Sequence, residues 1–132
     1  MKVGVLALQG AFSRHATLLD RVGVTPVEVR TPGQLADVDA LVMPGGESTT
    51  MSMLLEISGR RDPLAGRLAG GMPVLGTCAG LILLARNVAD GRSDQRSFGV
   101  IDIDVRRNGY GRQLDSFEAD LDVAGFDLPF HG

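Results

Sequence analysis

The sequence predicts an α/β fold in which a mostly parallel sheet is covered by helices on both faces, giving three layers. Two observations carry this prediction. Short apolar runs alternate with helical patterns over the first two thirds of the chain, as in proteins built on a parallel sheet. The 132 residues also include 18 glycines, about twice the usual share of ~7%. They stand where apolar runs end, which favours tight strand-to-helix turns over a low-complexity tract.

The first elements set the pattern. Residues 3–8 form a continuous apolar run and are predicted to be a buried strand. Residues 12–22 carry apolar side chains at helical spacing, and Gly23 is suited to end that helix. A short strand over 27–29 then closes in a turn over 31–33.

The pattern continues to residue 85, with Ser48 or Thr49 suited as the N-cap of the longest helix in this part. The predicted elements are, in order, a strand over 40–43, a helix over 48–57, a helix with Pro63 in its first turn that ends near Gly70, a strand over 74–75 and a helix over 81–85.

Beyond Asn87 the pattern changes. Alternation over 100–105 predicts a half-exposed strand, and Asn108-Gly109 is typical of a turn. Residues 115–121 fit either a strand or a loop. With no repeat and no linker in the sequence, we expect a single domain over 1–132.

Three glycine-bearing loops follow the predicted strands: Gln9-Gly10, residues 44–48 and residues 77–80. Ligands of parallel sheets bind at the carboxyl ends of the strands. We therefore expect these loops to form one crevice.

Bulk composition excludes some classes of partner. A net charge of −3 and a pI near 5.2 give no support for a nucleic-acid or membrane partner. No run approaches the ~18 apolar residues of a bilayer span. The only cysteine, Cys78, has no partner for an internal disulfide, so we expect a reducing, cytoplasmic setting.

That cysteine stands in Gly76-Thr77-Cys78-Ala79-Gly80, between a predicted strand and a predicted helix. This arrangement describes a nucleophile elbow, in which a tight turn exposes the nucleophile in a strained conformation. The start of the helix favours thiolate over thiol. Free cysteines are more often simply buried, but the glycines on both sides favour the elbow here. The oxyanion would be held by the N–H of Ala79 and an N–H from Gly45-Gly46.

Several blocks of this sequence resemble a known family. Pro44-Gly45-Gly46-Glu47-Ser48-Thr49-Thr50-Met51 and Gly76-Thr77-Cys78-Ala79-Gly80-Leu81 are similar to the signatures of the triad-type (class I) glutamine amidotransferases. Within these, the match is to the glutaminase subunits of pyridoxal 5'-phosphate synthase, supported by Leu8-Gln9-Gly10-Ala11, Arg107-Asn108, Gly111-Arg112-Gln113 and Asp115-Ser116-Phe117-Glu118. The resemblance implies a flavodoxin-like α/β domain.

The resemblance also implies a function. Cys78 would attack the side-chain amide of L-glutamine, with the oxyanion held near Gly46 and Ala79, and water would release glutamate from the thioester. No cofactor and no metal are implied. Ammonia would pass to a separate synthase subunit, which switches on the glutaminase by docking near Gln9-Gly10 and the following helix. The implied glutamine-contacting residues are Gly46, Glu47, Ser48 and Arg107.

The family's catalytic histidine and glutamate lie in a His-x-Glu motif further along the chain, whereas this chain stops at Gly132. We therefore expect a C-terminally incomplete domain, from a truncated copy or a fragment, with little or no glutaminase activity by itself. Neither histidine present is a good substitute. His15, in the first helix, is expected to be solvated or partner-facing, and His131 lies at the extreme terminus.

At other positions, an ordinary structural role competes with a functional one. Glu47 fits an ordinary first-turn acid, and Arg106-Arg107 fits a solvated pair that only the resemblance raises to a substrate contact. Arg60-Arg61-Asp62 is expected to be a solvated loop. The methionines at 43, 51, 53 and 72 are expected to fill the core.

Three other functions stay open. The chain could serve an amidotransferase of another pathway, such as histidine biosynthesis, although the blocks at 47–50 and 107–108 count against it. It could be a non-catalytic binding module that keeps the pocket and lacks the base. It could also be a redox sensor, which would be oxidised at Cys78 and indifferent to glutamine.

Overall fold

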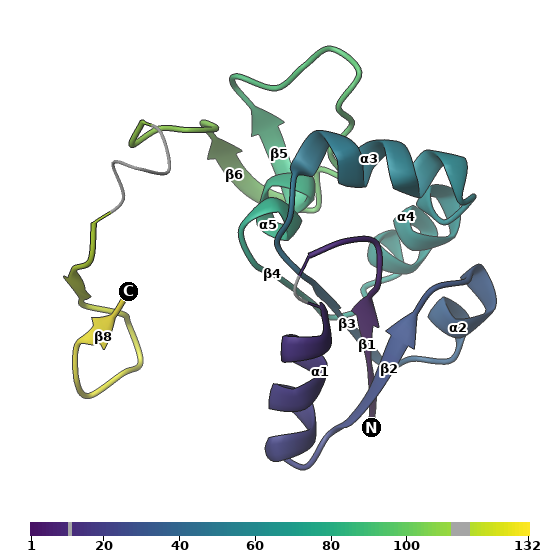
Figure 1. Ribbon diagram of the computed structural model, residues 1–132, viewed down its shortest axis with the longest axis horizontal. Helices are drawn as coiled ribbons and strands as arrows, with labels where there is room; N and C mark the ends of the chain where they lie inside the picture. The colour runs from purple at the N-terminus through teal and green to yellow at the C-terminus, as the bar shows by residue number, and fades with distance from the viewer. Residues whose placement is uncertain (11, 112–116) are drawn as a thin grey trace.

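The structure is a computed structural model that describes residues 1–10, 12–111 and 117–132 (Figure 1). Its central strands are β1 (Lys2–Leu6), β2 (Thr25–Val29), β3 (Ala40–Met43) and β4 (Val74–Gly76). They form a parallel sheet in the order β2-β1-β3-β4. The helices that connect and follow them are α1 (Phe12–Arg21), α2 (Pro32–Ala36), α3 (Ser48–Ile57), α4 (Arg61–Ala69) and α5 (Ala79–Leu84).

The sheet has a core on each face because successive strand residues point to opposite sides. On one face, Val5 and Val42 pack with Phe12 and other residues of α1. On the other face, Leu6 and Met43 belong to a larger cluster with residues of α2, α3, α4 and α5. Figure 1 shows α1 on one side of the sheet and α2 to α4 on the other. The predicted parallel sheet with helices on both faces is confirmed.

The turn predicted over 31–33 is instead the start of α2. The hydroxyl of Thr31 accepts from the backbone N–H of Gln34 at 3.3 Å, and the side chain of Gln34 accepts from the N–H of Thr31 at 3.0 Å. This reciprocal capping box, with Pro32 at the first helical position, nucleates one short helix. The turn prediction was wrong because a proline and a glycine together also suit a helix start.

The region after α5 differs in part from the prediction. Helix α5 ends at Leu84, and β5 (Ala85–Val88), which was not predicted, pairs in parallel with β6 (Ile101–Val105). Strand β6 alternates between half-buried and exposed residues, as its sequence indicates. Ile101 packs against the core, whereas Asp102 and Asp104 are exposed.

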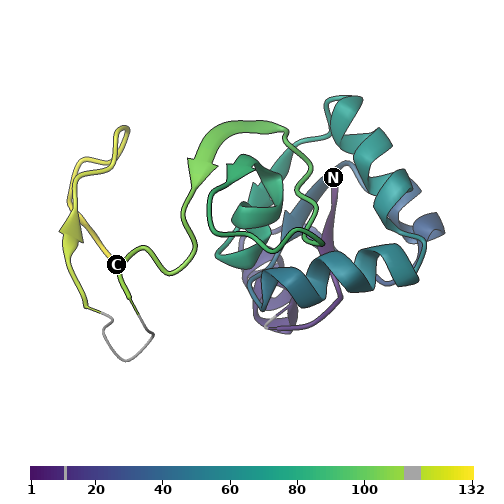
Figure 2. The ribbon, with the colours of Figure 1, turned by 90° about the horizontal axis from the view of Figure 1, so that it is seen from above.

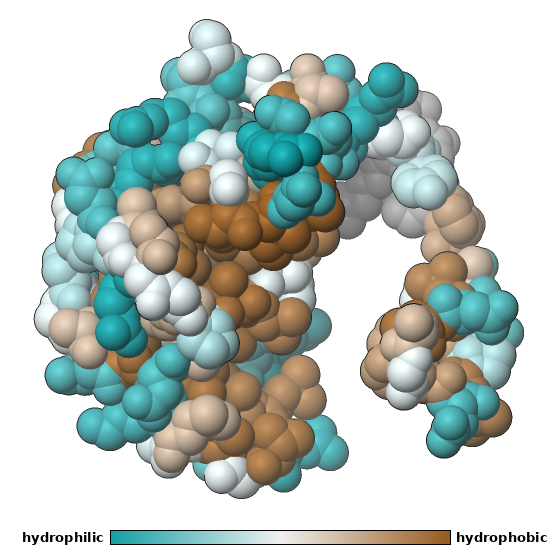
Figure 3. Space-filling view, turned by 180° about the vertical axis from the view of Figure 1, so that it is seen from behind, coloured by the Kyte–Doolittle hydropathy of each residue, from teal (hydrophilic) through white to brown (hydrophobic). Residues whose placement is uncertain are grey.

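A small ladder closes the described chain. Strands β7 (Asp120–Leu121) and β8 (Phe130–His131) pair antiparallel and are exposed. They stand apart from the body in Figures 1 and 2. Both a strand and a loop were considered for residues 115–121. The last two of these residues form β7, and residues 115–116 lie outside the described residues. The side of the body toward this ladder carries much apolar surface (Figure 3).

Two arginines predicted to be solvated are buried. Arg60 is 7% exposed, and its Nη1 donates to the carbonyl of Ala7, just after β1, at 3.2 Å and to that of Val29, the last residue of β2, at 3.1 Å. Arg61 is 6% exposed and lies over the ring of Phe98. Burial lowers the pKa of both guanidinium groups from the usual value. The prediction was wrong because backbone carbonyls at strand ends and in loops accept hydrogen bonds from these buried guanidinium groups. A run of charged residues in the sequence does not reveal such acceptors.

The methionine prediction holds at three of four positions. Met43, Met51 and Met72 are buried, whereas Met53 is 50% exposed. Met53 comes two residues after Met51 on α3, and a helix turns such a neighbour to a different face. The prediction was therefore wrong for Met53.

Replacing Arg61 by methionine is expected to lower the free energy of unfolding by about 2 kcal/mol, because two carbonyls in a partly buried loop lose their donors. These are the carbonyls of Arg96 and Ser97, each at 3.0 Å from Arg61. Urea unfolding midpoints measure the effect. Arg86→Met is the control, since its side chain is 58% exposed and its ion pair lies in solvent. Equal effects of the two substitutions would contradict the structural role of Arg61.

Candidate active site

Cys78 occupies the turn between β4 and α5 in the conformation expected of a nucleophile elbow. Its φ of 52° and ψ of −115° lie where few residues other than glycine are found. Only Cys78 and Asn108, among the described residues that are not glycine, have a positive φ. The thiol is free and exposed. The backbone therefore presents the sulfur at the surface, as the sequence indicates.

The glycines on either side of this turn leave no room for a side chain. A Cβ at Gly80 would stand 2.0 Å from the carbonyl oxygen of Met43, and one at Gly76 would stand 2.8 Å from the backbone nitrogen of Leu81. The turn is held by the N–H of Thr77, which donates to Met43 at 3.0 Å. The predicted tight turn is confirmed, and its cause is the close passage of α5 over the end of β3.

The three glycine-bearing loops meet as predicted. The side-chain amide of Gln9 donates to the carbonyl of Glu47 at 3.1 Å. A Cβ at Gly10 would stand 2.2 Å from the carbonyl oxygen of Gly45, and one at Gly45 would stand 3.2 Å from the Cβ of Cys78. The loops after β1, β3 and β4 are thus in direct contact at the carboxyl edge of the sheet.

The histidines occupy different environments. His15 on α1 is half-buried, and its Nε2 lies 3.3 Å from the hydroxyl of Thr77, the residue before Cys78. His15 is therefore less exposed than a fully solvated residue, and the expectation that it faces a partner stays a prediction. His131 is exposed, and its Nδ1 lies 2.9 Å from a carboxylate oxygen of Asp120 across the β7–β8 ladder.

Glu47 caps α3, in place of the predicted Ser48 or Thr49. Its carboxylate accepts from the backbone N–H groups of Thr49 at 3.1 Å and Thr50 at 2.7 Å, and from the Thr50 hydroxyl at 2.8 Å. The bond from the Thr50 N–H is the main reason that the pKa of Glu47 falls from 4.5 to about 2. Ser48 becomes the first helical residue and is 3% exposed; its Oγ has no hydrogen-bond partner among the described residues.

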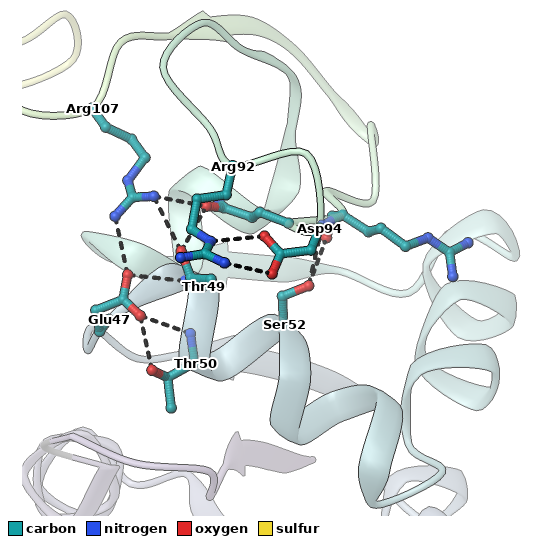
Figure 4. Close-up of polar contacts among 9 residues, drawn as sticks. Glu47, Thr49, Thr50, Ser52, Arg92, Asp94 and Arg107 are labelled. Carbon is teal, nitrogen blue, oxygen red and sulfur yellow. Dashed lines mark hydrogen bonds and ion pairs between the residues drawn. The ribbon is translucent and has the colours of Figure 1, made fainter.

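Arg107 joins this helix start from beyond β6 (Figure 4). Its Nη2 contacts the Glu47 carboxylate at 3.0 Å, and its Nη1 donates to the hydroxyl of Thr49 at 3.1 Å and to Oε1 of Gln95 at 3.0 Å. The Arg107 side chain is 21% exposed, whereas Arg106 is 76% exposed. The sequence suggested that both arginines are solvated, and this is correct only for Arg106. Gln95 was not predicted, because a lone glutamine in a loop carries no spacing signal.

A hollow of about 520 Å³ lies beside this cluster. The Arg107 guanidinium and the Glu47 carboxylate, paired with each other at 3.0 Å, lie side by side in its wall. Cys78, Gly46 and Ser48 are not among the residues that line it. The lining residues are Glu47, Thr49, Thr50, Met53, Asp90, Arg92, Arg107 and Asn108.

Within the described ranges, no three His, Cys, Asp or Glu side chains gather as metal ligands would. The helices described in the structure are also all too short or too polar to cross a bilayer. Some residues of the sequence resemblance lie outside the described residues, namely Ala11, residues 112–113 and residues 115–116.

Glu47→Gln is expected to flatten the loss of stability in acid. A carboxyl whose pKa is lowered on folding contributes stability above its ordinary pKa, and this contribution is lost as the pH falls through the folded value. For Glu47 that window runs from 4.5 to about 2. Urea midpoints measured from pH 6 to pH 2 should therefore fall more steeply for the parent protein than for the variant. Parallel curves would contradict the cap.

The comparisons with known proteins agree with this geometry. The model of the SNO glutamine amidotransferase family matches residues 5–132. A protein of Frankia alni named "Pyridoxal 5'-phosphate synthase subunit PdxT" is 56% identical over 97% of this chain and 64% of its own length. A protein of the same name from Salinispora arenicola is 54% identical over 98% of this chain and 65% of its own length.

A crystal structure of a glutamine amidotransferase superposes with a TM-score of 0.86 at 44% identity, covering 98% of this chain and 68% of that one. This confirms the predicted α/β fold of the class I amidotransferases. The chain spans less than two thirds of the length of the two curated relatives. From the family match and these identities, the chain belongs to the SNO glutamine amidotransferase family.

Proposed function

We propose that this chain carries the nucleophile and the substrate pocket of a glutaminase that supplies ammonia to a pyridoxal 5'-phosphate synthase. The observation that carries the proposal is the Cys78 elbow, strained at φ 52° and flanked by Gly76 and Gly80, at which a Cβ would clash with backbone atoms. The curated relatives named as subunits of that synthase support the choice of pathway.

In the proposed reaction, the Cys78 thiolate attacks the side-chain amide carbon of L-glutamine. The N–H groups of Ala79 and Gly46 hold the resulting oxyanion, and its collapse breaks the carbon–nitrogen bond. The leaving nitrogen takes a proton and departs as ammonia, and water then hydrolyses the thioester to glutamate. By resemblance, the acid and base would come from a His-x-Glu motif, which these 132 residues do not contain.

Glutamine also needs its α-amino and α-carboxyl groups recognised. We assign these contacts to Gly46, Glu47, Ser48 and Arg107, the residues implied by the resemblance. Arg107 and Glu47 stand 3.0 Å apart beside the hollow, so that opposite charges are available to a zwitterion. The buried Oγ of Ser48 has no hydrogen-bond partner in the described part of the chain and would supply a further donor or acceptor.

The partner in this proposal is a synthase subunit that docks near Gln9-Gly10 and α1. Gln9 contacts the carbonyl of Glu47, so a movement of its loop would reach the pocket directly. Leu18 of α1 is 54% exposed and is therefore accessible to a partner. We further propose that residues 1–132 belong to a single amidotransferase domain in the cytoplasm.

The test uses glutamine labelled with ¹⁵N in its side-chain amide, given to the complete gene product with the synthase subunit of the same organism. Pyridoxal 5'-phosphate should acquire the label in step with glutamate release, and release should fall sharply when the synthase subunit is left out. Glutamate release without label transfer would point to another pathway. An absence of glutamate release in the complete complex would overturn the proposal.

A further inference from the structure

We infer that Gln95 is a positioning residue that orients Arg107 for the carboxylate of the substrate; this rests on the proposed glutaminase function. Gln95 lies in the segment between β5 and β6, outside every block of the sequence resemblance. Its Oε1 accepts from Nη1 of Arg107 at 3.0 Å and from the hydroxyl of Thr49 at 3.2 Å. Two donors saturate the two lone pairs of an amide oxygen.

The guanidinium of Arg107 is thereby held from two directions. Nη1 is bound by Gln95 and Thr49, while Nη2 is bound by Glu47. The arginine side chain has several rotatable bonds, and its ordering costs free energy when a ligand binds. An arginine fixed before binding avoids that cost, so the contact from Gln95 should appear in the affinity for glutamine.

The backbone around Gln95 is itself anchored. The neighbouring residue Arg96 accepts through its carbonyl from buried Arg61 at 3.0 Å, and its N–H donates to the hydroxyl of Ser52 at 3.2 Å. The N–H of Phe98 donates to the carbonyl of Leu83 at 2.6 Å. Figure 4 shows Ser52 on α3 below this segment, one turn from Thr49. Anchors on α3, α4 and α5 thus set the position from which Gln95 reaches Arg107.

The side-chain amide is shielded rather than solvated. Its Nε2 is buried and has no hydrogen-bond partner among the described residues.

The amide of Gln95 is also electrically neutral, and this affects Arg107. A carboxylate at this place would give Arg107 a second anionic partner besides Glu47 and would reduce its attraction for a substrate carboxylate. A neutral acceptor orients the guanidinium and leaves its charge available.

The experiment measures glutamate release by the complete gene product bound to its synthase subunit. Gln95→Met keeps the length of the side chain and removes the acceptor. We expect its KM for glutamine to rise about tenfold, the loss of one charge-assisted hydrogen bond, with kcat changed less than about twofold. Arg96→Gln is the matched control. Arg96 is next to Gln95 in the sequence, but its side chain is 66% exposed and contacts Glu56 rather than Arg107. Its KM should be unchanged.

A second comparison separates positioning from a general structural effect. In an Arg107→Met background, Gln95→Met should raise KM no further, because the group that it orients is gone. An unchanged KM in Gln95→Met, or an equal increase in both backgrounds, would overturn the inference while wild-type glutamate release still supported the proposed function. Loss of glutamate release in the wild-type complex would instead remove the function on which the inference rests.

Discussion

Replacement of Cys78 by alanine is expected to reduce glutamate release by a factor on the order of 10⁴ or more, since covalent catalysis is lost together with its nucleophile. The activity should be measured as steady-state glutamate production by the complete gene product bound to the synthase subunit. Cys78→Ser, which keeps the size of the side chain, should be almost as inactive because a hydroxyl is much less ionised than a thiol at neutral pH.

The loss should be chemical rather than structural. Cys78 is exposed, so its truncation removes little packing, and the urea midpoint should change by less than about 0.5 kcal/mol in equivalent free energy. Binding to the synthase subunit should also persist. Activity within tenfold of the parent would contradict the assignment of Cys78, and unfolding of the variant would show that the residue is structural.

The second large effect is expected for Gly80→Ala. The new Cβ would stand 2.0 Å from the carbonyl oxygen of Met43, and the obstacle is backbone rather than a flexible side chain. Helix α5 or β3 would have to shift, which should lower the free energy of unfolding by about 3 kcal/mol or more and also displace Cys78.

Gly66→Ala provides the matched control for this substitution. Gly66 lies within α4, and a Cβ there meets no other atom within 4 Å. Alanine is favoured over glycine in a helix, so this variant should be more stable by about 0.5–1 kcal/mol. Urea unfolding of both variants measures the difference. A Gly80→Ala protein as stable as Gly66→Ala would show that the elbow is not packed as described.

Much of the fold could be predicted because it depends on local pattern. The apolar runs over 3–8 and 40–43 are the length of buried strands, and the glycines after them predicted the loops that meet at the sheet edge. The elbow at Cys78 was likewise visible, because a turn this tight requires Gly76 and Gly80. Each of these inferences needs only neighbours in sequence.

Some of the misjudged features depend on partners distant in sequence. Arg61 looked like part of a charge run, but the loop carbonyls at 96 and 97 bury it. Glu47 is a different case, because the N–H groups that it caps lie only two and three residues further along the chain. It looked like a first-turn acid, whereas it is the N-cap residue of α3. Strand β5 was missed because its partner lies in β6, beyond a long connection.

The candidate site divides in the same way. The sequence resemblance was needed to select Arg107, since an arginine pair is ordinarily solvated. Gln95 could not be selected at all, because its contact with Arg107, 12 residues further along the chain, arises only from folding. Polar clusters assembled across loops therefore require the structure, whereas a motif within one turn does not.

The most direct test of the central claim is the intact mass of the complete gene product, bound to its synthase subunit, after exposure to a glutamine-mimicking diazoketone. We predict one adduct, located on the peptide containing Cys78, prevented by excess glutamine and absent from Cys78→Ala. An unmodified protein, or an adduct at another residue that glutamine does not prevent, would contradict the assignment of Cys78 as the glutamine-directed nucleophile.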